Sequence, residues 1–209
     1  MSTPHPETEE PVELKEACVR AAREVIAEKG IEQLSLREVS RKLGVSHQAP
    51  YKHYPSRDHL LAEVMRRCFQ SFTEALDGRE RHEDPAADLE SLGRQYLAYA
   101  AANPLEYRLM FGTPWPEDAD HPGLAHDALH AFDVLRGVLR RLYGEGPEAQ
   151  AQVDLHAMFI WSTVHGLASI RQGCCMEHLH LAPGVGPQQI AGHALGMIER
   201  ALRGGGTGG

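Results

Sequence analysis

Apolar residues recur at intervals of three and four positions along almost the whole chain of 209 residues, and this spacing is typical of amphipathic helices. The sequence has no sustained alternation of apolar and polar residues, which would indicate half-buried strands, and no internal repeat. It therefore predicts an all-α protein with about nine helices. The expected helices run approximately over residues 12–29, 35–43, 46–54, 57–76, 85–102, 104–111, 124–142, 147–172 and 187–203.

The charged residues are unevenly distributed along the chain. The whole chain carries a formal charge of -8, but residues 12–60 contain nine Lys/Arg and seven Asp/Glu. This segment is therefore +2, and the rest of the chain is -10. A mildly basic N-terminal unit joined to an acidic body indicates a localised surface for nucleic acid.

The composition also excludes several classes of protein. Apolar residues make up 42% and charged residues 24%, which is ordinary globular usage. The longest mainly apolar stretch, residues 157–170, is too short and too polar to cross a bilayer, so we expect a buried helix and no membrane partner. The N-terminus lacks the basic start and apolar run of a signal peptide, so we expect a cytoplasmic protein. Residues 1–11 and 204–209 should be disordered tails.

Residues 35–54, with the sequence SLREVSRKLGVSHQAPYKHY, have the layout of a helix-turn-helix. Ser35 and Glu38 form a capping box that begins a short supporting helix. Gly44 supplies the left-handed residue that ends this helix, and the small Ser40 lies where the two helices approach each other. Four apolar residues can face the core made with the first helix, namely Leu36, Val39, Leu43 and Val45.

The second helix of this motif is too polar to be a strip of core. Gln48 can read an adenine edge, Lys52 can meet phosphate or guanine, and Tyr51 offers a rigid hydroxyl for phosphate. Pro50 has no N–H group and would forfeit a helical bond to the Ser46 carbonyl. We therefore expect either a helix that begins near Pro50 or a tight first turn, and we regard the phosphate contacts as better founded than the base contacts.

Residues 12–65 resemble the N-terminal domain of the TetR family of bacterial transcriptional regulators. The matching pieces are A-x-E-x-x-x-x-K-G in the first helix, S-L-R-x-V, L-G-V-S, Y-K-H-Y and S-R-D-H-L-L. The resemblance implies a DNA-binding domain over residues 12–58, in which residues 46–49 approach the bases and the phosphate backbone is contacted by Tyr51, Lys52, His53 and Arg57. The full set of candidate DNA contacts is Ser35, Arg37, Ser46, His47, Gln48, Ala49, Tyr51, Lys52, His53 and Arg57.

Two stretches of the C-terminal half resemble a subfamily named for a W-x-x-x-H-G signature. They are W-S-T-V-H-G-L, which contains Trp161 and His165, and N-P-L-E-Y-R-L-M-F-G, which spans residues 103–112. Trp161 and His165 are four positions apart and share a helix face. Two interpretations of His165 stay open: it donates to a bound effector, or it is a buried histidine that bonds to a neighbour and is stacked by Trp161.

The resemblance further implies that residues 59–203 bind an effector and join two copies of the chain into a homodimer. We expect a small, mostly apolar effector within each subunit, although an aromatic stripe of this kind also fits a plain core. The expected pocket residues are Tyr96, Tyr99, Met110, Phe111, Phe132, Met158, Trp161 and His165. The expected dimer interface is the apolar stripe Ile190, Ala194, Met197, Ile198 and Ala201, whose alternative is packing within one subunit. The implied function is a repressor that the effector releases from a double-stranded DNA operator.

The alternatives are a metal- or redox-responsive regulator or activator of the same fold and, from another class, a helical enzyme or interaction module. His126 and His130 are four positions apart and can share a metal, and Cys174–Cys175 is a candidate redox pair. Neither that histidine pair nor the pair at 178 and 180 has a second pair at a diagnostic spacing. The sequence also lacks a G-x-S-x-G, P-loop or G-x-G-x-x-G motif. We therefore expect no catalytic residues, no metal ligands and no cofactor.

Overall fold

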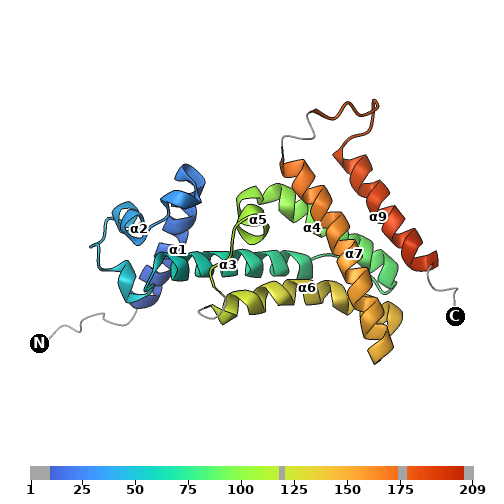
Figure 1. Ribbon diagram of the computed structural model, residues 1–209, viewed down its shortest axis with the longest axis horizontal. Coiled ribbons are helices and arrows are strands. Elements are labelled where there is room, and N and C mark those ends of the chain that lie inside the picture. Colours follow the sequence, from blue (N-terminus) through green and yellow to red (C-terminus); the bar gives the residue numbers. More distant parts are fainter. Residues whose placement is uncertain (1–9, 118–120, 174–177, 205–209) are drawn as a thin grey trace, which may run out of the picture. The chain divides into compact units, whose positions relative to one another are not determined.

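The computed structural model describes residues 10–117, 121–173 and 178–204. Within these ranges every regular element is helical, so the all-α prediction is confirmed (Figure 1). The elements are α1 (Glu10–Lys29), η1 (Ile31–Gln33), α2 (Leu36–Leu43), η2 (Pro50–Lys52), α3 (Arg57–Asp77), α4 (Pro85–Ala102), α5 (Pro104–Phe111), α6 (Pro122–Tyr143), α7 (Pro147–Gln172) and α9 (Pro187–Gly204). None of the described helices is long and apolar enough to cross a membrane.

The chain divides into two compact units. The first contains the described part of residues 1–69 together with 108–127, and the second contains 70–107 and the described part of 128–209. Helices α3, α5 and α6 each contribute residues to both units. The predicted boundary after residue 58 stays a prediction.

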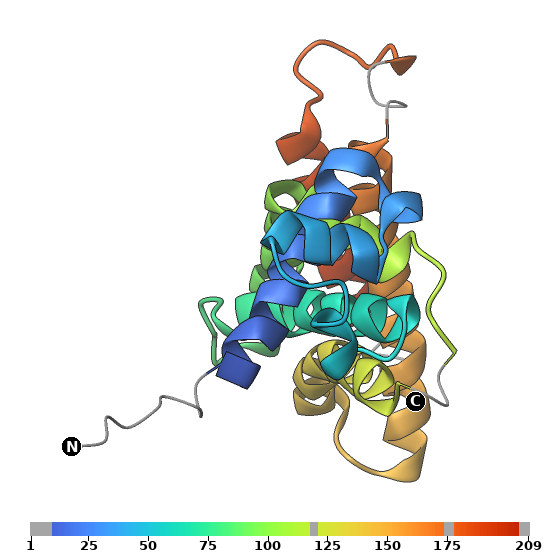
Figure 2. The same cartoon turned by 90° about the vertical axis from the view of Figure 1, so that its left-hand side faces the viewer.

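Burial of apolar stripes at helical spacing builds the first unit. Helices α1 and α2 cross in close contact (Figure 2). The buried stripe of α1 consists of Cys18, Ala22, Val25 and Ile26. The apolar residues at helical spacing on α3 are buried along its whole length. Those in the first unit are Leu61, Val64, Met65, Cys68 and Phe69, and the face continues into the second unit with Phe72 and Leu76.

In the second unit, α4, α7 and α9 pack on one another (Figure 1). Helix α7 buries one residue per turn, at Val153, Ala157, Ile160, Val164 and Ala168. Helix α9 approaches α4 at Gly93, where an added Cβ would lie 2.4 Å from Leu195 Cδ2. A larger residue at position 93 would force the Leu195 side chain to move, so Gly93 lets α9 pack closely on α4 here.

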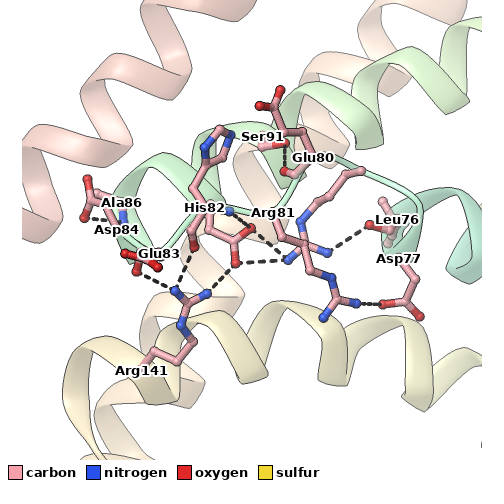
Figure 3. Close-up of polar contacts among 12 residues, drawn as sticks. Leu76, Asp77, Glu80, Arg81, His82, Glu83, Asp84, Ala86, Ser91 and Arg141 are labelled. Carbon is pink, nitrogen blue, oxygen red and sulfur yellow. Dashed lines mark hydrogen bonds and ion pairs between the residues drawn. The ribbon is translucent and has the colours of Figure 1, made fainter.

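A buried ion-pair network holds the segment between α3 and α4. Asp88 is 1% exposed, and its carboxylate lies 3.2 Å from Arg79 Nη2 and 2.6 Å from Arg141 Nη1. Arg141, from α6, also donates to the carbonyl oxygens of His82 at 2.8 Å and Glu83 at 2.6 Å (Figure 3). One carboxylate therefore ties the start of α4, the preceding loop and α6 together.

The structure departs from the sequence prediction at the start of α1. This helix begins at Glu10, two residues before the predicted start. Pro11 is compatible with the first turn, whose N–H groups have no partner within the helix. The remainder of the predicted tails, 1–9 and 205–209, lies outside the described residues.

Three apolar residues are more exposed than their place in the pattern suggested. The predicted core position of Val45 is wrong, because its side chain is exposed just after the turn that ends α2. Leu129 and Leu142 of α6 are also exposed. The buried stripe of α6 runs through Leu124, Ala131, Leu135, Val138 and Leu139. Leu129 lies five positions after Leu124, which is well off that stripe at 3.6 residues per turn.

Candidate functional site

The supporting helix of the predicted motif is present, with the expected residue at each end. The Glu38 backbone N–H donates to Ser35 Oγ at 3.1 Å, so Ser35 is the N-cap of α2. Gly44 follows α2 with a φ of 69°. This is the left-handed conformation that commonly ends a helix, and glycine adopts it without the steric strain that a Cβ would cause. Ser40 is buried, and its hydroxyl donates to the Arg37 carbonyl at 2.8 Å.

The helix predicted over residues 46–54 is shorter than expected and is not α-helical, but it begins at Pro50, which is one of the two outcomes expected for this proline. Residues 47–49 form a turn, and a single 3-10 turn, η2, follows over Pro50–Lys52. The Ala49 N–H donates to the Ser46 carbonyl at 3.0 Å, which gives that carbonyl a partner one residue earlier than an α-helix would. Because Pro50 has no N–H group to donate in an α-helical turn, the segment forms tighter turns whose hydrogen bonds join residues three positions apart.

This segment presents most of the candidate DNA contacts to solvent. The side chains of Ser46, His47, Gln48, Tyr51 and Lys52 are exposed, and those of Ala49 and His53 are half-buried. The His47 and Tyr51 rings are in contact, with their centroids 5.7 Å apart. A row of exposed polar and aromatic groups on one short turn has the composition that recognises a nucleic-acid groove.

Ion pairs neutralise much of the positive charge of α2. Glu38 pairs with Arg41 and Lys29, and these two cations lower the pKa of its carboxyl to about 2. Lys42 lies 2.8 Å from Glu28 and 3.1 Å from Glu24. These pairs link side chains of α2 to α1 and place a carboxylate beside each of these cations, although exposed pairs of this kind contribute little to stability.

Two of the four Lys/Arg residues in the helix-turn-helix segment, residues 35–54, differ from the other two. Arg37 and Lys52 are exposed, and neither has an ion-pair partner among the residues that the structure describes. Arg37 is on α2 and Lys52 ends η2, so the two positive charges come from both helices of the motif. They are the cations best placed to neutralise phosphate.

A second cluster of polar and aromatic groups lies in the second unit, around His165 of α7. The Tyr107 hydroxyl is 2.7 Å from His165 Nδ1, and the Tyr96 hydroxyl is 3.2 Å from the same atom. Ser169 Oγ is 3.4 Å from Nε2. Burial lowers the pKa of His165 and raises the pKa of both tyrosines, so all three groups are neutral at pH 7.

The structure brings only part of the predicted pocket together. Trp161 lies against His165, with ring centroids 5.6 Å apart, and against Phe132 at 5.8 Å. Tyr96 and Tyr99 both contact Phe72. By contrast, Met158 is exposed, and Met110 and Phe111 belong to the first unit. The set of eight is therefore not one cluster.

Tyr107 is not among the predicted pocket residues, although its hydroxyl makes the shortest of these polar contacts with His165. The available signal was its place in the N-P-L-E-Y stretch, three residues after the proline that begins α5. Spacing along α5 could not pair it with a histidine 58 positions later.

The pKa of His165 leads to a prediction about stability. A histidine with a lowered pKa in the folded state binds fewer protons than in the unfolded chain, so its contribution is complete above about pH 6.5 and is lost as pH falls through the folded pKa. The difference in free energy of unfolding between wild type and His165→Asn should therefore shrink from pH 8 to pH 5. Urea unfolding at each pH measures it. Leu129→Asn, which alters an exposed residue with no titratable group, should show no such trend, and equal trends for both variants would refute this contribution of His165.

The described residues add no support to the alternatives of a metal-responsive or a redox-responsive regulator. His126 and His130 are exposed, and the described residues contain no group of three or more His, Cys, Asp or Glu side chains arranged to hold a metal ion. The proposed redox pair Cys174–Cys175 lies outside the described residues. Cys18 and Cys68 are both buried.

A short capped helix, a left-handed glycine turn and an exposed polar turn define a helix-turn-helix DNA-binding protein. Residues 19–64 match the family described as bacterial regulatory proteins, tetR family, and residues 89–183 match the tetracyclin repressor-like C-terminal domain. The chain belongs to the TetR family of transcriptional regulators. The narrower W-x-x-x-H-G assignment stays a prediction.

Sequence identity to individual curated relatives is low. An HTH-type transcriptional regulator of Mycobacterium bovis is 29% identical over 108 residues, which cover 50% of this chain and 46% of the relative. The chain thus spans about half the length of the curated relatives it matches.

Solved structures match nearly the whole chain. A protein of unknown function from Rhodococcus sp. RHA1 has a TM-score of 0.72 at 23% identity, covering 95% of this chain and 99% of that one. A transcriptional regulator from Rhodococcus sp. RHA1 has a TM-score of 0.64 at 29% identity, covering 91% and 96%. The TetR family regulator PfmR from Thermus thermophilus has a TM-score of 0.59 at 20% identity, covering 89% and 97%.

Proposed function

We propose that this TetR-family regulator is a homodimeric repressor that binds a double-stranded DNA operator through α2 and the turn at residues 46–54. The observation that carries the proposal is the pairing pattern of the cations. Lys29, Arg41 and Lys42 are engaged by carboxylates, whereas Arg37 and Lys52 are exposed without an ion-pair partner in the described part of the chain. Exposed cations beside base-reading side chains such as Gln48 are what DNA recognition requires.

Lys52→Ala tests this interface. A phosphate contact releases bound counterions, so losing it should reduce the slope of log affinity against log salt by about 0.9. The measurement is fluorescence anisotropy over a salt series, with a duplex that the wild-type protein has selected from a random pool. Arg41→Ala is the matched control: its guanidinium pairs with Glu38, 2.6 Å away, so its slope should stay at the wild-type value. Equal slopes for Lys52→Ala and wild type would remove Lys52 from the interface.

We place the effector near the His165 cluster in the second unit. Supporting observations are its neutral polar groups on Tyr96, Tyr107 and His165, together with the aromatic rings of Phe132 and Trp161. A few convergent polar groups among aromatic side chains are the usual composition of a ligand site. Binding there would shift the population away from the DNA-binding conformation and, by reciprocity, weaken operator affinity by the same factor. Native mass spectrometry of the purified protein tests this, because an added mass lost on denaturation identifies the ligand.

The homodimer rests on exposed apolar side chains of α7 and α9. Leu155 is 72% exposed, and Met158 and Phe159, three and four positions later, are exposed on the same face. Met197 of α9 is 50% exposed. Large apolar groups gathered on two helices mark a surface that a partner covers.

The predicted stripe on α9 needs one correction. Ile198 is only 3% exposed and packs within its own subunit, in line with Leu195 and Leu202. The groove beside it is lined by residues of α4 and α7 as well as α9. The outward residues of the stripe are Ile190, Ala194, Met197 and Ala201, which are exposed or half-buried.

A further inference from the structure

Arg57 is the first residue of α3, the helix that follows the proposed DNA-binding turn at residues 46–54. The family resemblance implies that it contacts phosphate. The structure turns its side chain inward instead. Nε donates to the Leu34 carbonyl at 3.1 Å, and Nη2 donates to the Ile31 carbonyl at 3.0 Å. Nη1 pairs with the exposed carboxylate of Asp58 at 3.0 Å.

The two carbonyls belong to the turn that sets the start of α2. Ile31 begins η1, and its carbonyl also accepts from the Leu34 N–H at 3.1 Å. Leu34 is buried and is the C-cap of η1, and Ser35, the N-cap of α2, follows it directly. These bonds therefore tie the turn that precedes α2 to the start of α3.

A second contact anchors the C-terminal end of residues 44–54. Tyr54 is buried, and its hydroxyl donates to the Lys15 carbonyl of α1 at 3.3 Å. Residues 44–54 are therefore anchored at both ends. At the start the anchor is indirect, through α2 and the preceding turn that Arg57 holds. At the end it is direct, because Tyr54 bonds to α1. The base-reading side chains between them are on short turns with few backbone bonds of their own, so these anchors limit their movement.

The fork geometry of arginine suits this role. A guanidinium holds several N–H donors in one rigid plane and can reach two carbonyl oxygens at once. A lysine ammonium keeps the charge and binds phosphate well, but it is a single point on a flexible stem and cannot reproduce both contacts. A lysine at position 57 can therefore keep a charge contact with phosphate, but it cannot make both of these carbonyl contacts.

We propose that Arg57 is a positioning residue for DNA binding: its guanidinium holds the turn at residues 31–34, and with it the N-terminus of α2, rather than contacting phosphate. This proposal rests on the DNA-binding function. It assigns to the first residue of α3 the task of orienting the helix that supports the reading turn.

Hydrogen exchange of the free protein, paired with DNA binding, tests this role. The variants are Arg57→Lys and Arg57→Ala, with Asp58→Asn as the matched control that removes only the exposed partner of the guanidinium. We expect the amides of residues 33–36 to exchange about tenfold faster in both Arg57 variants and at the wild-type rate in Asp58→Asn. Amides of α4 in the same samples report whether the whole chain is destabilised.

DNA affinity then separates positioning from phosphate contact. Arg57→Lys should bind the selected duplex about tenfold more weakly than wild type although the charge is kept. Wild-type affinity and exchange in Arg57→Lys would overturn the proposal. So would an Arg57→Ala variant with unchanged exchange and a salt slope lowered by about one, which is the result for a phosphate contact. If the wild-type protein selects no DNA, the proposed function fails, and the positioning role fails with it. Faster exchange in the Arg57 variants would then show only that Arg57 stabilises the fold of this turn.

Discussion

Asp88→Ala should lower the free energy of unfolding by about 3–5 kcal/mol, a large share of the stability of an ordinary domain. The physical reason is the burial of the Asp88 carboxylate itself and of Arg79. Arg79 and Arg141 both pair with this carboxylate, and Arg79 is itself buried. Without Asp88, a buried guanidinium has lost its counter-charge, and the His82 N–H, 3.4 Å from Oδ1, has lost its acceptor.

Urea unfolding, followed by circular dichroism, measures this change. The matched control is Glu90→Ala on the same helix, which breaks an exposed pair with Arg94 at 2.5 Å. An exposed pair one turn apart contributes only about 0.3–0.5 kcal/mol. Asp88→Asn keeps the shape but removes the charge, so it should also be strongly destabilising. A loss for Asp88→Ala no larger than that for Glu90→Ala would show that the network does not hold the segment between α3 and α4.

Combining Leu155→Glu with Met197→Glu should convert the protein to a monomer and weaken operator affinity by about 100-fold or more. Both side chains are exposed, so the charges cost little within one subunit, whereas two copies would have to bury four unpaired carboxylates. The loss of DNA affinity follows because a dimer binds its second half-site intramolecularly, at a high effective concentration that a monomer lacks.

Light scattering gives the mass, and anisotropy gives the operator affinity. The control is Leu129→Glu, which adds a charge at an exposed leucine of α6 and should leave the dimer intact. A double variant that stays dimeric would place the interface elsewhere. Ile198→Glu is unsuitable as a test despite its place in the predicted stripe, because it would put a carboxylate into the buried contact with α4 and α7 and unfold the subunit.

The sequence by itself determined the helical architecture and the location of the DNA-binding motif. Helical periodicity placed all seven apolar residues of the α3 face in the core, from Leu61 to Leu76. Ser35 and Gly44 marked the ends of α2 because capping and positive φ are local requirements that a few neighbouring residues satisfy. Such features depend on interactions within about one helical turn, and a sequence displays these directly.

Only the tertiary structure decided which side chains meet across the chain. Asp88 and Arg141 are 53 positions apart, Tyr107 and His165 are 58 apart, and Arg57 reaches a carbonyl 26 positions earlier. Periodicity also could not separate Met197 from Ile198, since both fall within one apolar stripe and only the position of α4 buries one and exposes the other. Local spacing fixes the direction of a side chain about its own helix, but the partner it meets depends on how the helices pack, which no local pattern encodes.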